Sequence, residues 1–130
     1  LVFSAQLSER RRAGSAQAHV ALMMAHEDTI VPNLSTTRLA QALEVETVGT
    51  ALIDIPGVPV VADSVVGNLP DGATGGLLQF DATQPAEGAA WEDASHADLH
   101  RSVQGLDTLE PFMLTVLDGG TPVLVDPYAE

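Results

Sequence analysis

The sequence predicts an α/β fold, a mostly parallel sheet with helices packed on it. Residues 19–25 form a continuous apolar run without polar alternation, which is typical of a strand buried on both faces of a parallel sheet. A polar loop at 26–33 and a helical pattern at 34–43 follow, which is the order of half a βαβ unit. A second strand at 76–81 and helical spacing within 97–117 repeat this order of elements.

The first 48 residues divide into two predicted parts. Residues 1–17 are expected to form a helical lead-in, because Phe3 and Leu7 lie at helical spacing and Gly14 can end the helix. Residues 18–48 then hold the first strand, an acidic loop and the first helix of the sheet.

The middle of the chain has a different composition. Residues 49–73 are rich in Pro and Gly, and extended pieces are expected at 50–55 and 58–62. Prolines at this density exclude a long helix and favour edge strands or an excursion from the sheet. We therefore expect residues 49–73 to be an insertion that covers the functional site.

Residues 74–130 are predicted to return to the sheet and to end in helices. The strand at 76–81 leads into a long loop, and helices are expected at 97–105 and 106–117, the second with Pro111 in its first turn. An extended piece at 121–127 follows the second helix. The whole chain is expected to form one domain.

The composition excludes several classes of function. Acidic residues number 18 against 5 basic ones, so the net charge is −13, which disfavours nucleic acid as a partner. The chain contains no cysteine, which excludes disulfides, thiol catalysis and zinc–cysteine sites. No apolar stretch approaches the roughly 18 residues that a membrane-spanning helix needs. We expect no cofactor and no transmembrane segment.

Two residues are placed where catalytic groups collect in α/β proteins. Asp28 follows the first predicted strand, and His96 follows the second. The carboxyl ends of strands in an open sheet are where ligands and catalytic side chains gather. An ionised carboxylate that accepts from one imidazole nitrogen leaves the other nitrogen free as a general base. Asp28 and His96 are therefore the candidate catalytic residues.

The pattern around Asp28 resembles that of a known family. Asp28-x-x-Val31-Pro32 after an aliphatic strand, followed by a helix, a strand and a loop histidine, resembles the C-terminal third of an α/β-hydrolase. The lipase and esterase branch, notably bacterial secreted lipases, is the most similar. The resemblance implies that Asp28 is the acid and His96 the base of a Ser-His-Asp triad, because the chain order there is nucleophile, acid, histidine. It also implies an ester or lipid substrate and an extracellular or cell-surface location.

The chain departs from that family in several ways. It contains no Gly-x-Ser-x-Gly motif, and Ala25 stands where the family often has glycine. The serine and the oxyanion-hole loop are therefore expected upstream of Leu1, in a missing N-terminal part of the same protein, and this chain alone is expected to be inactive. The strand at 19–25 would pair with an upstream strand. Its exposed aliphatic edge predicts that the fragment is marginally stable or associates.

Two alternatives use other features of the chain. His96, Asp98 and His100, together with His26 or Asp28, offer imidazole and carboxylate ligands for a metal-dependent hydrolase. Residues two apart do not share a face if this stretch is helical, which counts against such a site. The second alternative is a non-catalytic α/β module whose acidic surface packs against a partner.

Overall fold

The computed structural model describes residues 16–129. The predicted helical lead-in at 1–17 lies almost entirely outside these residues, and Ala16 and Gln17 belong to no helix or strand. Along the described chain the elements are β1 (Val20–Ala25), α2 (Asn33–Leu43), β2 (Glu46–Val48), β3 (Val60–Val61), β4 (Ser64–Val66), the 3-10 helix η1 (Pro70–Gly72), β5 (Gly75–Phe80), β6 (Ala82–Thr83), β7 (Glu92–Asp93), the 3-10 helix η2 (Leu99–Arg101), α3 (Val103–Leu117) and β8 (Val123–Val125).

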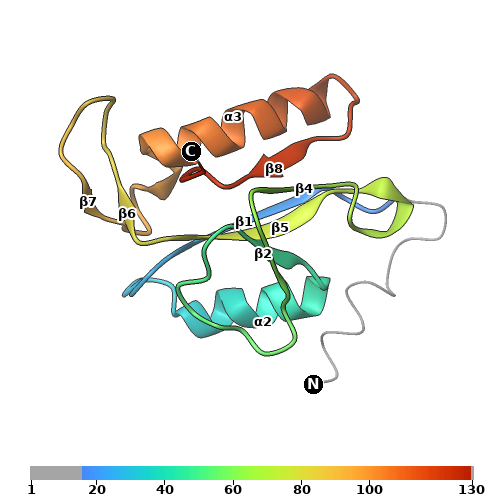
Figure 1. Ribbon diagram of the computed structural model, residues 1–130, viewed down its shortest axis with the longest axis horizontal. Helices are drawn as coiled ribbons and strands as arrows, with labels where there is room; N and C mark the ends of the chain where they lie inside the picture. Colours follow the sequence, from blue (N-terminus) through green and yellow to red (C-terminus); the bar gives the residue numbers. More distant parts are fainter. Residues whose placement is uncertain (1–15, 130) are drawn as a thin grey trace.

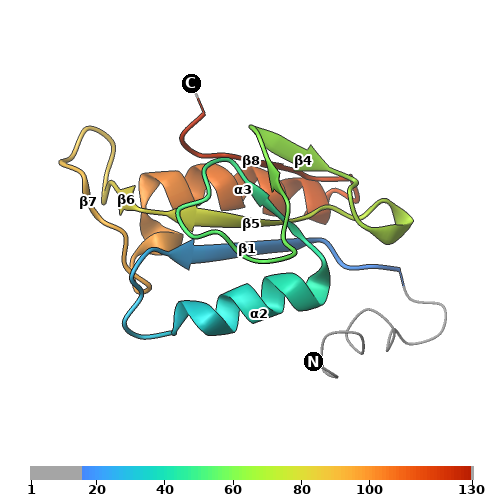
Figure 2. The same cartoon turned by 60° about the horizontal axis from the view of Figure 1, so that its bottom comes forward.

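Four strands form a parallel sheet in the order β1-β5-β2-β3. Helix α2 covers one face of the sheet and α3 the other (Figure 1). Figure 2 shows β1 beside β5, with α2 below them. Two small antiparallel pairs, β4 with β8 and β6 with β7, complete the described strands. The predicted α/β class with a mostly parallel sheet is confirmed.

The pairing of β1 with β5 brings the ends of the two strands together. Their register runs from Val20 opposite Gly75 to Ala25 opposite Phe80, so both strands end at the same edge of the sheet. The ladder continues one residue further, where the His26 N–H donates to the Phe80 carbonyl oxygen at 2.7 Å. The loops that follow β1 and β5 therefore start side by side.

Apolar side chains form two cores, one on each face of the sheet. On the α3 side Leu78 and Phe80 pack with Phe112, and on the α2 side Leu77 packs with Ala40. Full burial of a large apolar side chain contributes about 1.5–3 kcal/mol, so both helices are held mainly by these contacts. The loops between the elements are positioned by two packed layers.

The strongest predicted elements are confirmed. Strand β1 lies within 19–25, α2 begins one residue before the predicted 34–43, and β5 lies one residue ahead of the predicted 76–81. The prediction that the first strand is buried on both faces is wrong. Only Met24 and Ala25 of β1 are buried, because β1 lies at the edge of the sheet, whereas every residue of β5 is buried.

The middle of the chain contributes to the sheet more than its composition predicts. Strand β2 lies between β5 and β3 inside the sheet. The extended piece predicted at 50–55 is wrong: no strand forms there. The side chain of Gln79 instead takes the place of a neighbouring strand, accepting from the Ile53 N–H at 2.7 Å and donating to the Ile53 carbonyl at 3.0 Å. A glutamine side chain thus makes the hydrogen bonds to the Ile53 N–H and C=O groups that a neighbouring β-strand would otherwise make.

The helix predicted at 97–105 is also wrong. That stretch holds the short η2 and then Ser102, which has extended backbone angles and caps α3 by accepting from the Gly105 N–H at 3.1 Å. Helix α3 then runs from Val103 without a break past the predicted boundary between residues 105 and 106, so Pro111 lies inside it and not in its first turn. Apolar spacing continues through both segments and hides the point where the serine starts the helix.

Among residues 16–129, no helix has the length and apolar character needed to cross a membrane. The longest, α3, has 15 residues.

Candidate active site

Asp28 is held in place by the loop that contains it. The loop begins where β1 ends, and its turn places Glu27 at a positive φ of 60°. One carboxylate oxygen of Asp28, Oδ1, accepts from the backbone N–H groups of Ile30 at 2.8 Å and Val31 at 3.0 Å. Two donors from the same short loop fix the orientation of the carboxyl group, and its second oxygen remains free for another partner.

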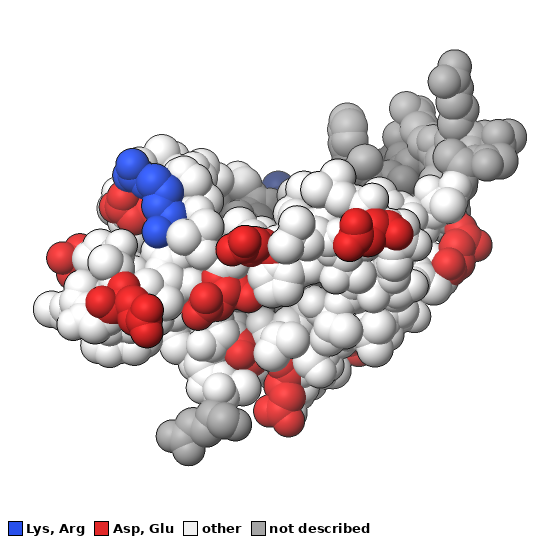
Figure 3. Space-filling view, turned by 90° about the horizontal axis from the view of Figure 1, so that it is seen from above, with Lys and Arg blue, Asp and Glu red and all other residues white. Residues whose placement is uncertain are grey.

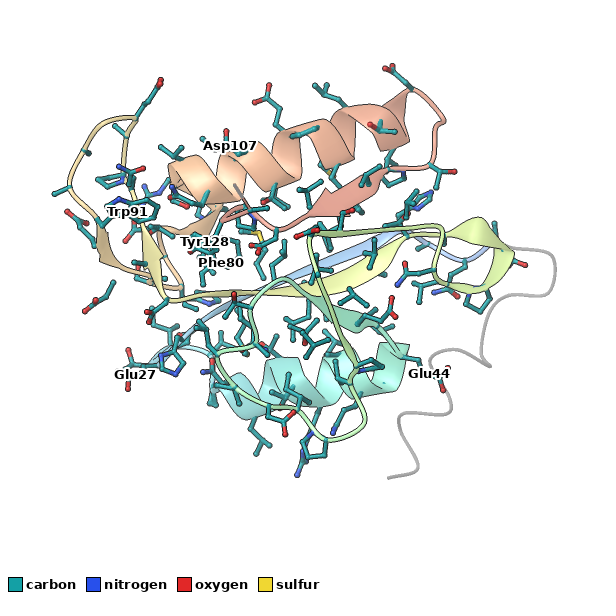
Figure 4. All side chains as sticks on the ribbon, in the orientation of Figure 1. Glu27, Glu44, Phe80, Trp91, Asp107 and Tyr128 are labelled. Atoms are coloured by element: carbon teal, nitrogen blue, oxygen red, sulfur yellow. The ribbon has the colours of Figure 1, made fainter. Side chains whose placement is uncertain are left out.

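That second partner is His96. Its Nδ1 lies 2.9 Å from Oδ2 of Asp28, although the two residues are 68 positions apart in the sequence. The loop carrying His96 is anchored next to the end of β5, because the Ala94 N–H donates to the Asp81 carbonyl at 2.8 Å. Figure 4 shows Glu27, the neighbour of Asp28, beside the end of β1. The shared sheet edge thus brings the two predicted site residues together.

Hydrogen-bond chemistry determines the tautomer of His96. An ionised carboxylate only accepts, so Nδ1 of the ring carries a proton, and in the neutral ring Nε2 has the free lone pair. The Asp28 side chain is 6% exposed and that of His96 is 47% exposed. No hydrogen bond to Nε2 is formed within residues 16–129. The ring therefore presents a basic nitrogen to the outside while its other nitrogen is fixed.

The surroundings of Asp28 favour its ionised form. Burial raises the pKa of the carboxyl group, but the N–H groups of Val31 and Ile30 and the ring of His96 outweigh this effect, so the pKa lies below its ordinary value. Asp28 is consequently ionised at neutral pH. It can stabilise a positive charge on His96, which is what a general base needs after it takes up a proton.

The other candidate residues do not join this pair. Asp98 is occupied by Ser95, whose hydroxyl donates to it at 2.6 Å, and by the Arg101 guanidinium, also at 2.6 Å. These two contacts lower the pKa of Asp98. His26 instead lies 3.6 Å from Asp81, and His100 is exposed. The described part of the chain brings no three His, Asp or Glu side chains together as metal ligands, so the metal alternative lacks a ligand set here.

None of the described serines is hydrogen-bonded to the ring of His96. The Ser95 hydroxyl is bound to Asp98, and Ser102 is buried at the start of α3, where its hydroxyl donates to the Leu99 carbonyl at 2.8 Å. Ser35 and Ser64 have no hydrogen bond to the ring of His96. Within residues 16–129 the site is thus an acid–base pair without a hydroxyl partner.

An aromatic group near the site was not predicted from the sequence. Phe80, Trp91 and Tyr128 lie near the N-terminal end of α3 (Figure 4), with ring centroids 6.0 Å apart for Phe80 and Tyr128 and 6.3 Å apart for Trp91 and Tyr128. The Tyr128 hydroxyl donates to the Ala82 carbonyl at 2.5 Å. Burial, followed by the charges of Asp126 and Asp81, raises the pKa of Tyr128 to about 12. No local pattern near the C-terminus indicates this contact.

A cavity of about 360 Å³ lies between the β6–β7 pair and η2. Its walls include the acidic side chains of Glu92, Asp93 and Asp98 together with Arg101. These charged groups share the lining with a similar amount of apolar surface. Outside the cavity, Ile30, whose N–H bonds to Asp28, is 65% exposed, and Leu34 in α2 is 61% exposed.

No family model, curated protein or solved structure matches the chain. The function is therefore inferred from the fold class and from the hydrogen-bonded pair of Asp28 and His96, which we call the dyad.

Proposed function

We propose that the chain supplies the acid and base of a carboxylic-ester hydrolase of the lipase or esterase type. Asp28 is the acid and His96 the base of a Ser-His-Asp triad, and the serine belongs to polypeptide outside the 130 residues. One observation carries the proposal: the 2.9 Å contact between His96 Nδ1 and a carboxylate that its own loop holds ionised. The contact leaves Nε2 free for a serine hydroxyl.

In this mechanism Nε2 of His96 takes the proton of the serine hydroxyl while the serine oxygen attacks the ester carbonyl carbon. The protonated ring then gives that proton to the leaving alcohol, and an acyl-enzyme remains. A water molecule then hydrolyses the acyl-enzyme. Nε2 takes a proton from the water while the water oxygen attacks the acyl carbonyl carbon, and the protonated ring then gives that proton to the departing serine oxygen. Asp28 holds the ring and stabilises its positive charge throughout.

The order of elements supports the same assignment. The acid follows one strand and the base follows the neighbouring parallel strand, which is the order of acid and histidine in α/β-hydrolase triads. The exposed Ile30 next to Asp28 favours an ester with an apolar acyl group over a charged substrate.

The test is hydrolysis of a p-nitrophenyl ester by the complete protein that contains this chain. Asp28→Asn and His96→Gln are expected to lower kcat by about 10³-fold or more, with folding unchanged by circular dichroism. His100→Gln is the matched control, since this exposed histidine is not hydrogen-bonded to Asp28. Activity that survives His96→Gln overturns the proposal.

A further inference from the structure

The cavity between the β6–β7 pair and η2 contains two carboxylates that have no partner. Asp98 is fully occupied, because Arg101 donates to its Oδ1 and the hydroxyl of Ser95 to its Oδ2, each at 2.6 Å. Glu92 and Asp93 also line the cavity, and their side chains form no ion pair or hydrogen bond within residues 16–129. Figure 3 shows acidic and basic side chains next to each other at the left, at the end of the molecule that carries β6 and β7. The lining therefore carries negative charge that the described chain does not balance.

A buried hydroxyl group in the same lining also has no partner. Thr83 is 4% exposed, and its hydroxyl makes no hydrogen bond to any described residue. Among the described side chains, only Oδ1 of Asn33 is both enclosed by protein and without a partner, so the Thr83 oxygen is open to the cavity that its residue lines. A buried polar group without a hydrogen bond is unfavourable. The Thr83 hydroxyl therefore indicates a place where another molecule supplies the missing bond.

The register of β6 and β7 places this hydroxyl beside one of the free carboxylates. Thr83 lies directly opposite Glu92 in the antiparallel pair. Side chains of opposite residues stand on the same face, with Cβ atoms about 4.5–5.5 Å apart. The two side chains are not hydrogen-bonded to each other in the part of the chain that the structure describes. A group with several donors can therefore lie between them and bond to both.

The lining favours one class of ligand over the others. An anion is disfavoured, because three carboxylates line the cavity and its one guanidinium, that of Arg101, is bonded to Asp98. A metal ion lacks a ligand set, since no three His, Cys, Asp or Glu side chains converge among residues 16–129. The volume of about 360 Å³ lies within the roughly 300–1,000 Å³ of small-molecule sites, and much of the lining is apolar. An organic cation with an apolar part fits these features.

We propose that the cavity binds a primary alkylammonium ion. Its ammonium group lies between Thr83 and Glu92, and its alkyl chain lies along the apolar part of the lining. A primary ammonium has three N–H donors, so it bonds to the hydroxyl and the carboxylate together, whereas a quaternary ammonium leaves the hydroxyl unpaired. The net charge of −13 attracts cations to the chain and favours the same class of ligand. This site does not depend on the dyad or on ester hydrolysis.

Titration of the 130-residue chain with n-hexylammonium chloride in about 0.15 M salt, followed by ¹H–¹⁵N NMR, tests the proposal. We expect saturable shifts of the amides of Thr83 and Glu92, with a Kd of about 1 mM or less, which a ligand of this size reaches at ordinary efficiency. Two probes of the same chain length, 1-hexanol without the charge and hexyltrimethylammonium without the N–H groups, should bind about tenfold more weakly. Magnesium chloride should cause no saturable shift of these amides.

Thr83→Val separates a binding role of the hydroxyl from a structural one. No hydrogen bond within the described chain is lost, so the Tm should be unchanged or higher, but the Kd should rise about tenfold through the lost bond to a charged group. Glu92→Gln should raise the Kd about three- to tenfold by removing the facing charge. Glu87→Gln is the matched control, since Glu87 lies between β6 and β7 but does not line the cavity. It should change the Kd less than about twofold, because salt screens a distant charge.

Several results would overturn the proposal. These are the absence of a saturable shift, binding of 1-hexanol or hexyltrimethylammonium as tight as that of n-hexylammonium, and saturable binding of magnesium at the same amides. A Kd that Thr83→Val leaves unchanged has the same consequence. So does an effect of Glu87→Gln equal to that of Glu92→Gln, which would indicate general attraction to an acidic chain. If Thr83→Val does not fold, the two glutamine variants still decide, because Glu87 and Glu92 are exposed.

Discussion

Asp28→Asn should reverse the tautomer of His96. In the wild type the carboxylate only accepts, so Nδ1 of His96 carries the proton at 2.9 Å. The asparagine retains an oxygen for the N–H groups of Ile30 and Val31 and turns its NH₂ group toward the ring. Because that group donates, Nδ1 must become an acceptor and the proton must move to Nε2. The variant thus loses the basic nitrogen that faces outward.

The exposure of the Asp28–His96 pair determines how much Asp28→Asn lowers the free energy of unfolding. A hydrogen bond to a charged group contributes about 1.5–3 kcal/mol to stability and a neutral one about 0.5–1.5 kcal/mol. His96 is 47% exposed, so water competes and the lower end of this difference applies, about 1 kcal/mol. For a domain of this size such a loss lowers Tm by about 3–5 °C. A tautomer preference of about 1.4 kcal/mol gives a tenfold population ratio, which is easily measured.

Two-dimensional ¹H–¹⁵N correlation of the histidine rings, recorded where the rings are neutral, reads the tautomers directly. His19 provides an internal reference, because its Nδ1 accepts from the Thr74 N–H at 2.9 Å and so must have the opposite tautomer in both proteins. The signals of His96 are assigned by their loss in His96→Gln. If His96 has the same tautomer in the wild type and in Asp28→Asn, the dyad described above is not formed.

Three further predictions concern stability measured by urea denaturation. Because folding lowers the pKa of Asp28, the advantage of the wild type over Asp28→Asn should be complete above the ordinary aspartate pKa of about 4 and should decline as the pH falls through the folded pKa. An advantage that grows as the pH is lowered below about 4 would contradict this. Gly105→Ala should lower the free energy of unfolding by about 1–3 kcal/mol, because the new Cβ would collide with the Leu99 carbonyl oxygen. This collision outweighs the gain in helix propensity of about 1 kcal/mol. A variant that is more stable than the wild type would refute the contact. Tyr128→Phe should cost about 0.5–1.5 kcal/mol through the lost bond to Ala82. The folded pKa of Tyr128 is raised to about 12, so the wild type should also lose stability between about pH 10 and that value, and the phenylalanine variant should lack this loss.

Two features of the fold could be predicted because their signals are local. The apolar runs that became β1 and β5 and the helical spacing of α2 each lie within about ten residues, and their order predicts a parallel pairing. Parallel neighbours end at the same edge, so the meeting of Asp28 with His96 followed from the order of elements without any knowledge of the connection between them.

Other features depend on contacts that no local pattern encodes. Strand β2 has only three residues, and it joins the sheet by pairing with β5 on one side and β3 on the other. The backbone of Ile53 is satisfied by Gln79, a buried side chain 26 positions away. Both arrangements are decided by tertiary packing, which overrides the composition of a short segment.

The two halves of the dyad are held to different degrees, and this has a consequence for function. The side chain of Asp28 is fixed by two backbone donors of its own loop and is 6% exposed, whereas that of His96 is half-exposed and, among residues 16–129, its ring is hydrogen-bonded through Nδ1 alone. The carboxylate therefore determines where the imidazole points, and the ring can turn only by giving up that contact. In the proposed triad, a serine that reaches Nε2 would therefore meet an imidazole whose tautomer Asp28 has already set.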